Sequence, residues 1–405
     1  MRKNIIFMYS MYIFNMLFPM ILMPLITNNI TKDEYGYYSL AYTCFTFCFI
    51  LCDFSFNLTE ARTIHKKSKD EIDETINDVQ LSRYVFAFIS SILATVYFVS
   101  VESFSNGVFY FFVTFFGLVG YVSFASWYYV SMNDMKQNTL LFVIMKICSL
   151  ISIVAYVELY GELNWKIVYL ASVIYYPLIG FYITSRLKKD RGVKYNFSIV
   201  RVAKKIKRGG YLFMTDFAPN LYNTIPLILV SSYISIEKYA IFNLANRLSL
   251  VISGGVYVFL RAIYPSLCSK YNKNNAFKLI LLFLFVIISG VAINYYFGES
   301  VIVSLFGEGY VGAYPYISVM LIGIIFLGVS ESIQFAYLLP NNKDGFLAYA
   351  SLFVVVISVI FLVFTFNTFK EWSLIYTVLL SRIMYMILYL GVYIRDNHQK
   401  KKTYA

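Results

Sequence analysis

The stretch from Arg186 to Gly210 reads RLKKDRGVKYNFSIVRVAKKIKRGG and separates two long, mainly apolar parts of the chain. It carries ten Lys or Arg side chains and one acid, Asp190. Lys and Arg near an apolar span resist translocation, so a positive block of this kind stays on the cytoplasmic side. The stretch therefore predicts the orientation of the chain and joins its two halves. Its simplest interpretation is a topology anchor that touches anionic lipid.

The composition indicates a membrane protein. Apolar residues make up 59% of the chain and charged residues only 14%. The apolar residues come in runs of roughly 20, the length that crosses a bilayer. The net charge of +12 is concentrated between these runs, so membrane topology explains it better than binding to nucleic acid does. Cys44, Cys48 and Cys52 recur at helical spacing inside one run, which is typical of packing residues rather than of a disulfide or a metal site.

Twelve apolar runs follow one another, and no segment between them is long enough for a soluble domain. One of the longest segments between them, Thr59–Leu81, mixes bases with acids and is predicted to be a solvated face. The chain is therefore predicted to be an all-α integral membrane protein with twelve transmembrane helices. The runs are Asn4–Ile26, Gly36–Leu58, Ser82–Ser100, Gly107–Val130, Asn138–Val157, Trp165–Ser185, Gly210–Ile234, Tyr239–Pro265, Phe277–Phe297, Ala313–Leu339, Leu347–Phe366 and Leu374–Ile394.

An even number of spans places both termini on one side of the membrane. Of the 34 Lys and Arg, 26 are assigned to the tails and loops on that side. Only four lie in the opposite loops: Lys32, Lys166, Lys238 and Lys370. This imbalance predicts that both termini are cytoplasmic. The last four cations are assigned to the interior of the runs: Lys146, Arg247, Arg261 and Arg382.

An internal repeat relates the two halves. The twelve residues from Ile30 to Ala41 align with those from Ile234 to Ala245 at an offset of 204 residues, with four identities. Six predicted spans separate the copies, so the repeats are parallel and related by a pseudo-twofold axis along the membrane normal. We therefore predict two six-helix bundles, residues 1–185 and 210–405, joined by a basic cytoplasmic linker, residues 186–209.

The charges inside the runs indicate a polar interior. A charge at the bilayer centre costs about 2.5–3.5 kcal/mol on insertion scales, so these cations are expected to face water rather than lipid. Arg247 and Arg261 are 14 residues apart, nearly four helical turns, and are predicted to share one face of the eighth span. The repeat offset places Arg261 over Asn57, which lies between Asp53 and Glu60 at helical spacing. Polar faces of both halves are therefore expected to line one cavity.

The seventh run carries a similar polar stripe with Asp216 and Asn220. Surplus guanidinium groups in a cavity favour an anionic ligand, and their planar fork suits phosphate. The alternative is a set of structural ion pairs inside the bundle, which stays open above all for Lys146, Arg382 and Glu331. No P-loop, zinc-binding pair or nucleophile with a histidine in reach occurs in the sequence, so the chain is predicted not to be an enzyme and to hold no metal.

Several segments resemble Wzx-type polysaccharide flippases of the MOP superfamily. They are PLITNNITKDEYGYYSLAYTCFTFCFILCDFSFNLTEAR (Pro24–Arg62), WYYVSMNDMK (Trp127–Lys136), AIFNLANRLSLVISGGVYVFLRAIYPSL (Ala240–Leu267) and LFGEGY (Leu305–Tyr310). The resemblance covers most of the chain through loose motifs that follow apolar spacing. It departs at Asp53-Phe54, where the family often has Gly-Phe, and this leaves the packing of the second span open.

The resemblance implies two six-helix bundles around a V-shaped cavity that opens alternately to the two faces of a bacterial inner membrane. The implied substrate is an undecaprenyl-diphosphate-linked oligosaccharide, carried outward for O-antigen or capsule assembly. It leaves room for a polysaccharide polymerase and chain-length machinery as further partners. The cations expected to hold the diphosphate are Arg62, Lys146, Arg247 and Arg261. The cavity residues expected beside them are Asn57 and Asn220.

Coupling and two alternative functions stay open at this stage. No cofactor is expected, but transport could be coupled to H⁺ or Na⁺ through Asp53, Asp216 or Glu331. A drug/cation antiporter of the same superfamily would need unpaired buried acids, whereas four intramembrane bases against three clear acids favour an anionic substrate. A membrane glycosyltransferase or polymerase is less favoured, because the predicted outward loops are too short to form a catalytic site.

Overall fold

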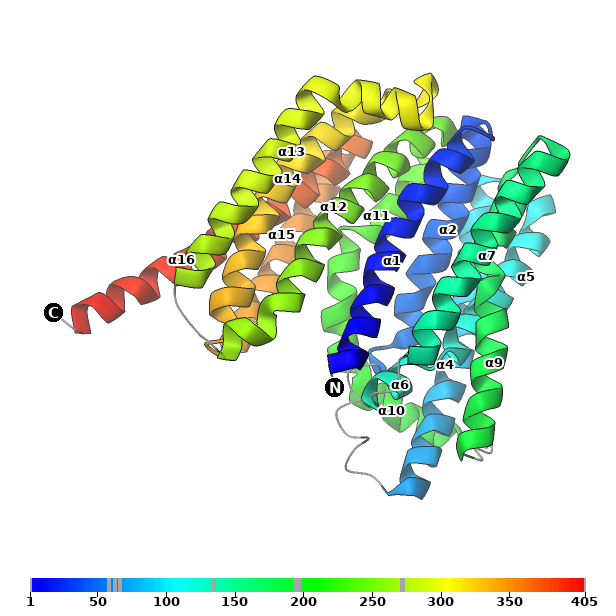
Figure 1. Cartoon of the computed structure of the whole chain (residues 1–405), viewed down its shortest axis with the longest axis horizontal. Helices are drawn as coiled ribbons and strands as arrows, with labels where there is room; N and C mark the ends of the chain where they lie inside the picture. Colours follow the sequence, from blue (N-terminus) through cyan, green and yellow to red (C-terminus); the bar gives the residue numbers. More distant parts are fainter. Residues whose placement is uncertain are drawn as a thin grey trace. The chain divides into compact units, whose positions relative to one another are not determined.

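The computed structural model describes residues 2–56, 60, 64, 68–132, 136–191, 198–269 and 274–403 (Figure 1). Within these ranges every regular element is a helix and no strand is present, so the all-α prediction is confirmed. Ten of the described helical segments are long and apolar enough to cross a membrane, and a shorter apolar segment covers Met16–Thr27. The chain is therefore a multi-pass membrane protein, whereas the count of twelve spans stays a prediction.

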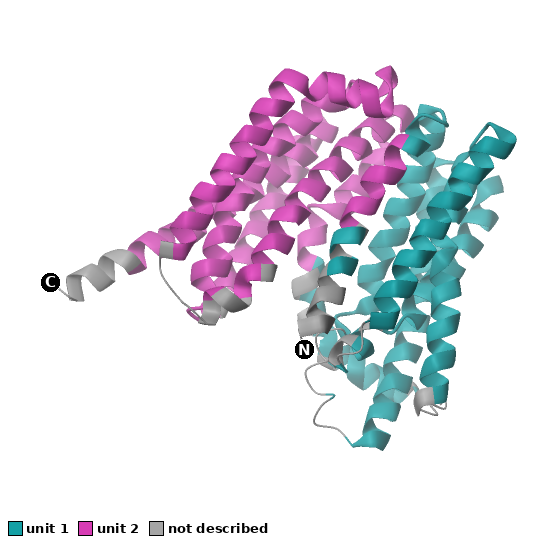
Figure 2. Ribbon diagram, viewed as in Figure 1, with its two compact units in different colours: residues 1–14, 25–217 teal, residues 15–24, 218–405 magenta. Residues whose placement is uncertain are grey.

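The chain divides into two compact units, which Figure 2 shows in different colours. Unit 1 comprises residues 1–14 and 25–217, and unit 2 comprises residues 15–24 and 218–405. The predicted linker, residues 186–209, covers the end of one helix, the undescribed residues 192–197 and the first half of the helix Ile199–Phe217. That helix belongs to unit 1.

Unit 1 holds the helices that correspond to the first six runs, followed by the basic helix α10. Helix α1 contributes residues to both units. The helices are α1 (Arg2–Thr27), α2 (Lys32–Asp53), α4 (Lys69–Val101), α5 (Phe104–Ser123), α6 (Ser126–Ser131), α7 (Lys136–Tyr160), α8 (Trp165–Val173), α9 (Tyr175–Arg191) and α10 (Ile199–Phe217).

Unit 2 begins with a broken helical segment and continues with five long helices, among which α14 packs against α12, α13 and α16. The elements are η2 (Ala218–Leu221), α11 (Thr224–Leu229), η3 (Val230–Ser232), α12 (Ile236–Ser269), α13 (Asn274–Phe306), η4 (Glu308–Tyr310), α14 (Ala313–Ile333), η5 (Gln334–Leu338), α15 (Asp344–Phe369) and α16 (Glu371–Thr403).

Close packing in unit 1 depends on small residues where α5 meets α9. A Cβ atom at Gly120 would lie 2.2 Å from the backbone nitrogen of Pro177, and one at Gly180 would lie 2.5 Å from the carbonyl oxygen of Gly120. Only hydrogen fits at these positions, so the two backbones approach directly, as small residues allow in membrane helices. This contact fixes the position of the helix that leads into the basic segment.

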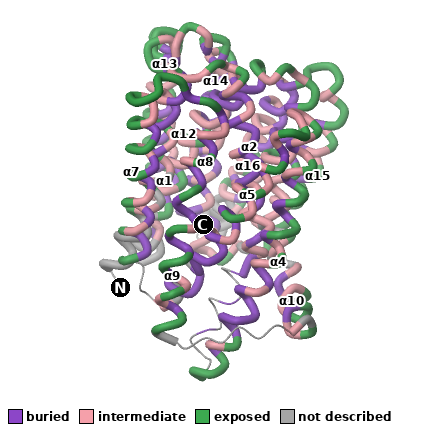
Figure 3. Tube along the Cα trace, turned by 90° about the vertical axis from the view of Figure 1, so that its right-hand side faces the viewer, coloured by how far each residue is buried: buried purple, intermediate pink, exposed green. Residues whose placement is uncertain are grey.

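The outer faces of the long helices suit a lipid environment. Large apolar side chains such as Phe285 on α13 and Phe364 on α15 are mostly exposed, and Figure 3 shows exposed positions recurring along both helices. Regular helices satisfy their own backbone hydrogen bonds, so apolar faces of this kind are stable in hydrocarbon. The hydrophobic surface is therefore explained by the bilayer.

The segment Thr59–Leu81 differs from the prediction. Its charges predict a solvated face, but helix α4 already begins at Lys69. Ser68 and Glu71 form a capping box that satisfies the first backbone N–H groups of this helix. Asp78 is buried, because the polar start of α4 packs against α10. The prediction of a solvated face is wrong there, since one face of this polar turn is covered by a basic helix.

Candidate functional site

An ion pair lies inside the helix bundle of unit 1. Arg83 on α4 is 1% exposed, and its Nη2 lies 2.7 Å from Oδ1 of Asp53 at the end of α2. The other carboxylate oxygen accepts a hydrogen bond of 2.7 Å from the hydroxyl of Tyr121. Arg83 Nη1 donates to the side chain of Gln80 and to the carbonyl oxygen of Val122. The network satisfies both oxygens of the carboxylate, as a buried charge requires.

Arg83 is an interior cation, although the charge count along the sequence predicts it to lie in a loop. Arg83 lies at the border of the third apolar run and was counted among the cytoplasmic positive charges. The continuous helix α4 instead places it in the interior, opposite Asp53. The signal was present in the sequence, because Arg83 already lies within the predicted run. Asp53 therefore has a structural partner, which is the alternative left open for buried acids.

Lys146 lies in the interior of unit 1 and is 2% exposed. Its Nζ lies 4.9 Å from the ring centroid of Phe142, one turn away on α7, and 5.9 Å from that of Tyr175 on α9. Aromatic faces attract cations, so the ammonium has an electrostatic partner in each ring. Lys146 is thus buried beside two aromatic rings of unit 1.

The predicted cations of unit 2 lie on one helix, α12. Arg247 Nε donates a hydrogen bond of 2.7 Å to the side-chain oxygen of Asn243, whose amide donates to the hydroxyl of Tyr239. Tyr239 and Asn243 are fully buried, whereas Arg247 is partly exposed. The chain of hydrogen bonds holds the guanidinium at a fixed place on the helix and leaves part of it accessible.

Arg261 lies on the same helix and is exposed. Its guanidinium lies 5.8 Å from the ring centroid of Tyr257, one turn earlier. Helix α12 is continuous from Ile236 to Ser269, so the 14 residues between Arg247 and Arg261 correspond to about 21 Å along its axis. A diphosphate is much shorter than that distance. In the described conformation each guanidinium lies beside the residue four positions before it, Asn243 for Arg247 and Tyr257 for Arg261, so the two do not converge on one point.

A second polar cluster lies within unit 2, between α14 and α16. The Oε2 atom of Glu331 is buried and has no hydrogen-bond partner among the described residues. Tyr385 and Tyr389 of α16 are its electrostatic neighbours, and Tyr385 donates a hydrogen bond to Ser351 of α15. Glu331 lies three residues before the start of the π-helical turn η5, a distortion often found at functional sites. This carboxylate can accept a proton or a small cation.

Other predicted site residues are placed as follows. Asn220 lies in η2, where its side-chain oxygen accepts a hydrogen bond of 2.8 Å from Thr224. Arg382 on α16 donates to the carbonyl oxygen of Met320. The backbone of Asp216 belongs to α10, but its side chain lies outside the described atoms, as do residues Asn57 and Arg62. In the described ranges no three His, Cys, Asp or Glu side chains lie close enough together to hold a metal ion.

The sequence is similar to known proteins over nearly its whole length. Residues 1–269 match the family model described as polysaccharide biosynthesis protein. A "Putative O-antigen transporter" of Shigella dysenteriae is 19% identical over 397 residues, 96% of this chain and 98% of that protein. A protein of the same name from Escherichia coli strain K12 is 23% identical over 298 residues, 70% of this chain and 68% of that protein.

Two kinds of solved structure share the fold. The lipid II flippase MurJ in an inward closed conformation superposes with a TM-score of 0.69 at 15% identity, covering 95% of this chain and 87% of that one. An inward-facing multidrug resistance MATE family transporter of the MOP superfamily superposes with a TM-score of 0.61 at 13% identity, covering 98% and 96%. At these identities the likeness is one of fold.

Proposed function

We propose that this chain, which belongs to the family of polysaccharide biosynthesis proteins, is a membrane flippase for a lipid-linked oligosaccharide. The similarity predicted from sequence motifs is confirmed by the family match and by relatives named as O-antigen transporters. The relatives and the structural neighbours reported above are named as transporters or flippases, so the chain is classed as a transporter and not as an enzyme. The multi-pass helical fold agrees with this class.

The main evidence for an anionic substrate is Arg247, which is partly exposed although it lies within an apolar helix. A charge at this depth is costly, and the hydrogen bonds to Asn243 and through it to Tyr239 hold the guanidinium in place. A fixed guanidinium recognises phosphate through paired N–H donors. We assign Arg247 to the diphosphate of an undecaprenyl-linked repeat unit for O-antigen or capsule. Arg261, about 21 Å further along α12, would meet the diphosphate at another stage or contact the sugars.

Outward movement from the cytoplasmic leaflet fits the energetics of such a substrate. Moving one charge through 100 mV is worth about 2.3 kcal/mol, and a diphosphate carries about two negative charges. An inside-negative membrane potential would therefore favour export of the head group by several kcal/mol. The direction is inferred from this sign and from the predicted cytoplasmic side of the basic segment.

A parallel repeat of two six-helix bundles is part of the proposal. Glu34 accepts a hydrogen bond from the backbone N–H of Trp165 at the start of α8. At the repeat offset, Lys238 pairs at 2.6 Å with Glu371, at the start of α16. The first pair thus links the start of the second span of unit 1 to the start of its last span, and the second pair does the same in unit 2. Polar contacts between corresponding helix starts in each unit support a duplicated bundle.

The transport test uses Arg247. In a strain lacking the gene, Arg247→Ala is expected to insert normally but to abolish surface glycan, with the lipid-linked unit accumulating inside. Arg247→Lys is also expected to lose transport, because an ammonium cannot reproduce the fork that binds both phosphate and Asn243. Arg395→Ala serves as the control, since this arginine is 65% exposed near the carboxyl end. Normal surface glycan from the Arg247→Ala strain would refute the assignment.

Coupling to H⁺ or Na⁺ is proposed at Glu331. Among the acids considered, Asp53 is already bound to Arg83, whereas one oxygen of Glu331 has no hydrogen-bond partner in the described structure. Glu331→Gln keeps the shape and removes the titratable charge. Transport by this variant in vesicles is expected to become insensitive to an imposed pH or Na⁺ gradient. An unchanged gradient dependence would remove Glu331 from the coupling site.

The same carboxylate is the one observation that favours a drug/cation antiporter, the second candidate. A cationic drug would be drawn to a buried acid, whereas Arg247 would repel it. Overproduction in a drug-sensitive strain separates the two functions. The flippase proposal predicts unchanged drug tolerance together with restored surface glycan, and the antiporter proposal predicts the reverse.

A further inference from the structure

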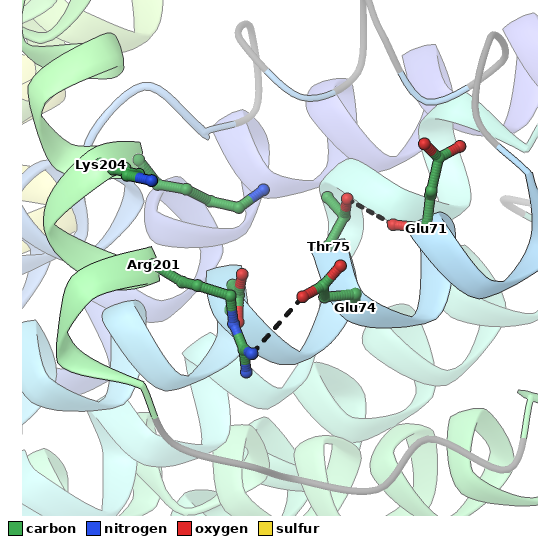
Figure 4. A pocket seen from close by; sticks show the side chains of 7 residues that line it. Glu71, Glu74, Thr75, Arg201 and Lys204 are labelled. Carbon is green, nitrogen blue, oxygen red and sulfur yellow. Dashed lines mark hydrogen bonds and ion pairs between the residues drawn. The ribbon is translucent and has the colours of Figure 1, made fainter.

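The basic helix α10 is bound to the start of α4 by a set of ion pairs, which we name the α4–α10 clasp. Arg201 Nε lies 3.0 Å from Asp78 Oδ1, and Arg201 Nη1 lies 3.5 Å from Glu74 Oε1. The clasp also includes Lys205, one turn later, which lies 3.3 Å from Oε1 of Glu60, a residue that precedes α4. Figure 4 shows Arg201 and Lys204 on one side and Glu71 and Glu74 on the other side of a cavity of about 280 Å³.

The clasp is partly removed from water, which makes its charges more effective. The side chains of Asp78 and Glu60 are buried, and that of Lys205 is mostly buried. Asp78 also accepts a hydrogen bond of 3.1 Å from the side-chain amide of Asn77. Ion pairs with buried partners are screened less by salt than exposed ones. Acids of unit 1 therefore neutralise Arg201 and Lys205, so these bases do not depend on anionic lipid for a partner.

Aromatic rings fix the second half of α10 to the same unit. The ring of Phe54 stacks on Phe213 of α10 with centroids 4.4 Å apart and on Phe86 of α4 at 5.0 Å. Phe217, the last residue of α10, lies 6.2 Å from Phe47 of α2. The helix is thus attached by charge at its start and by apolar contacts at its end. It has the contacts of a packed element and not those of a free linker.

Directly after α10 the helical geometry breaks. Residues Ala218–Leu221 form a 3₁₀ turn, and Pro219 and Pro226 remove backbone donors that a continuing α-helix would use. The chain passes from unit 1 to unit 2 at this point, between Phe217 and Ala218. The break in the helix and the boundary between the units therefore coincide.

We propose that α10 is a strap held on unit 1 by the α4–α10 clasp throughout transport, and that the chain bends at residues 218–223. This inference rests on the proposed flippase function for its transport readout. The part of the predicted basic linker that lies in α10 is then a rigid element, and Arg201 and Lys205 form ion pairs within unit 1. If the clasp stays closed, α10 moves together with unit 1, and the chain changes direction only at residues 218–223.

Cross-linking tests whether the clasp stays closed. Glu74→Cys and Lys204→Cys, which leave the Arg201–Asp78 and Lys205–Glu60 pairs in place, are introduced together after replacing Cys148 and Cys268 by Ala, and a short, reducible bis-methanethiosulfonate reagent joins the pair. The pair is expected to cross-link in membranes, unlike either single variant, and the cross-linked protein is expected to keep transporting. Failure to cross-link, or an arrest of transport that reduction reverses, would overturn the proposal.

Charge reversal tests whether the clasp matters. Arg201→Glu places three acids together and is expected to lose transport, while Glu74→Lys combined with it restores an opposite-charge pair and is expected to recover transport. Lys207→Glu makes the same change in charge at an exposed position of α10. If Lys207→Glu were as harmful as Arg201→Glu, overall positive charge rather than the clasp would be responsible.

These experiments separate the clasp from the proposed function. The yield of cross-linking in membranes does not depend on any substrate. If the wild-type chain moved no lipid-linked oligosaccharide, the flippase proposal would fail, and an unsuccessful cross-link would refute the clasp independently. A cross-link that forms but stops a working transporter would refute the closed strap alone.

Discussion

Charged residues inside the helices show what can and cannot be predicted residue by residue. The sequence indicates that Lys146 and Arg247 lie in apolar runs, and the structure places both within the corresponding helices. It cannot show that Asp53 meets Arg83, because this pairing depends on which helices become neighbours. The separation of Arg247 and Arg261 along one helix follows from the sequence alone, whereas the direction of each side chain along that helix does not.

The buried ion pair of unit 1 is expected to be essential for stability. Arg83→Ala would leave the Asp53 carboxylate without its cation, at a cost of about 3–5 kcal/mol. The expected result is a much lower melting temperature in detergent. Asp53→Asn in the Arg83→Ala background should recover part of the loss, because no uncompensated charge remains. Equal stability of the wild type and Arg83→Ala would show that the pair is not needed.

Replacing a buried amide in unit 1 is expected to raise the stability of the protein, in contrast to removing Arg83. Asn138 on α7 is 1% exposed, and neither its side-chain oxygen nor its nitrogen has a hydrogen-bond partner in the described structure. An unsatisfied buried polar group costs about 1–3 kcal/mol, so Asn138→Leu is expected to raise the melting temperature.

The matched control for Asn138→Leu is the same substitution at Asn164. The side chain of Asn164 accepts a hydrogen bond from the backbone of Ile167 at the start of α8. Asn164→Leu should lower stability by about 1 kcal/mol, as loss of a helix cap does. A lower melting temperature for Asn138→Leu as well would show that the buried amide makes a contact that stabilises the fold.

At the level of elements, apolar periodicity located the helices better than their ends. The runs Asn138–Val157 and Leu347–Phe366 lie within α7 and α15. The polar start of α4 was missed, because hydropathy ends where the membrane ends while the helix continues against α10. Contacts between helices could not be predicted either. A glycine in the sequence does not show which helix, if any, packs closely against it.

The crossing of α5 and α9 provides a test at this level. Gly120→Ala is expected to destabilise the protein by about 1–3 kcal/mol, because the new methyl group would overlap the backbone at Pro177. Gly290→Ala is the matched control in the middle of α13, where nothing lies within 4 Å of the added atom. That substitution should be neutral or should stabilise the helix by about 0.5–1 kcal/mol. Melting temperatures in detergent compare the two, and a similar shift for both would argue against a tight crossing.

At the scale of the whole molecule, the chain forms two compact units, whereas the two six-helix bundles stay a prediction. The count of positive charges located a basic segment between the halves, and the chain changes unit shortly after it, at Phe217. The difference has a physical cause. Bases such as Arg201 and Lys205 find acids on unit 1, and this compensation is invisible when charges are only counted along the chain.

The orientation of the chain leads to a prediction about the whole molecule. Lys188 lies near the end of α9, on the side predicted to be cytoplasmic, and Gly161 lies between α7 and α8, on the opposite side. Gly161 has a positive φ of 79° with nothing within 4 Å, so a cysteine there would be accessible at the cost of some strain. In a background without Cys148 and Cys268, Gly161→Cys is expected to react with an impermeant maleimide in spheroplasts, and Lys188→Cys only after the membrane is opened. The reverse pattern would show that the topology is inverted. The basic segment would then face away from the cytoplasm, where the substrate is loaded. The outward direction inferred for an anionic head group would lose its basis.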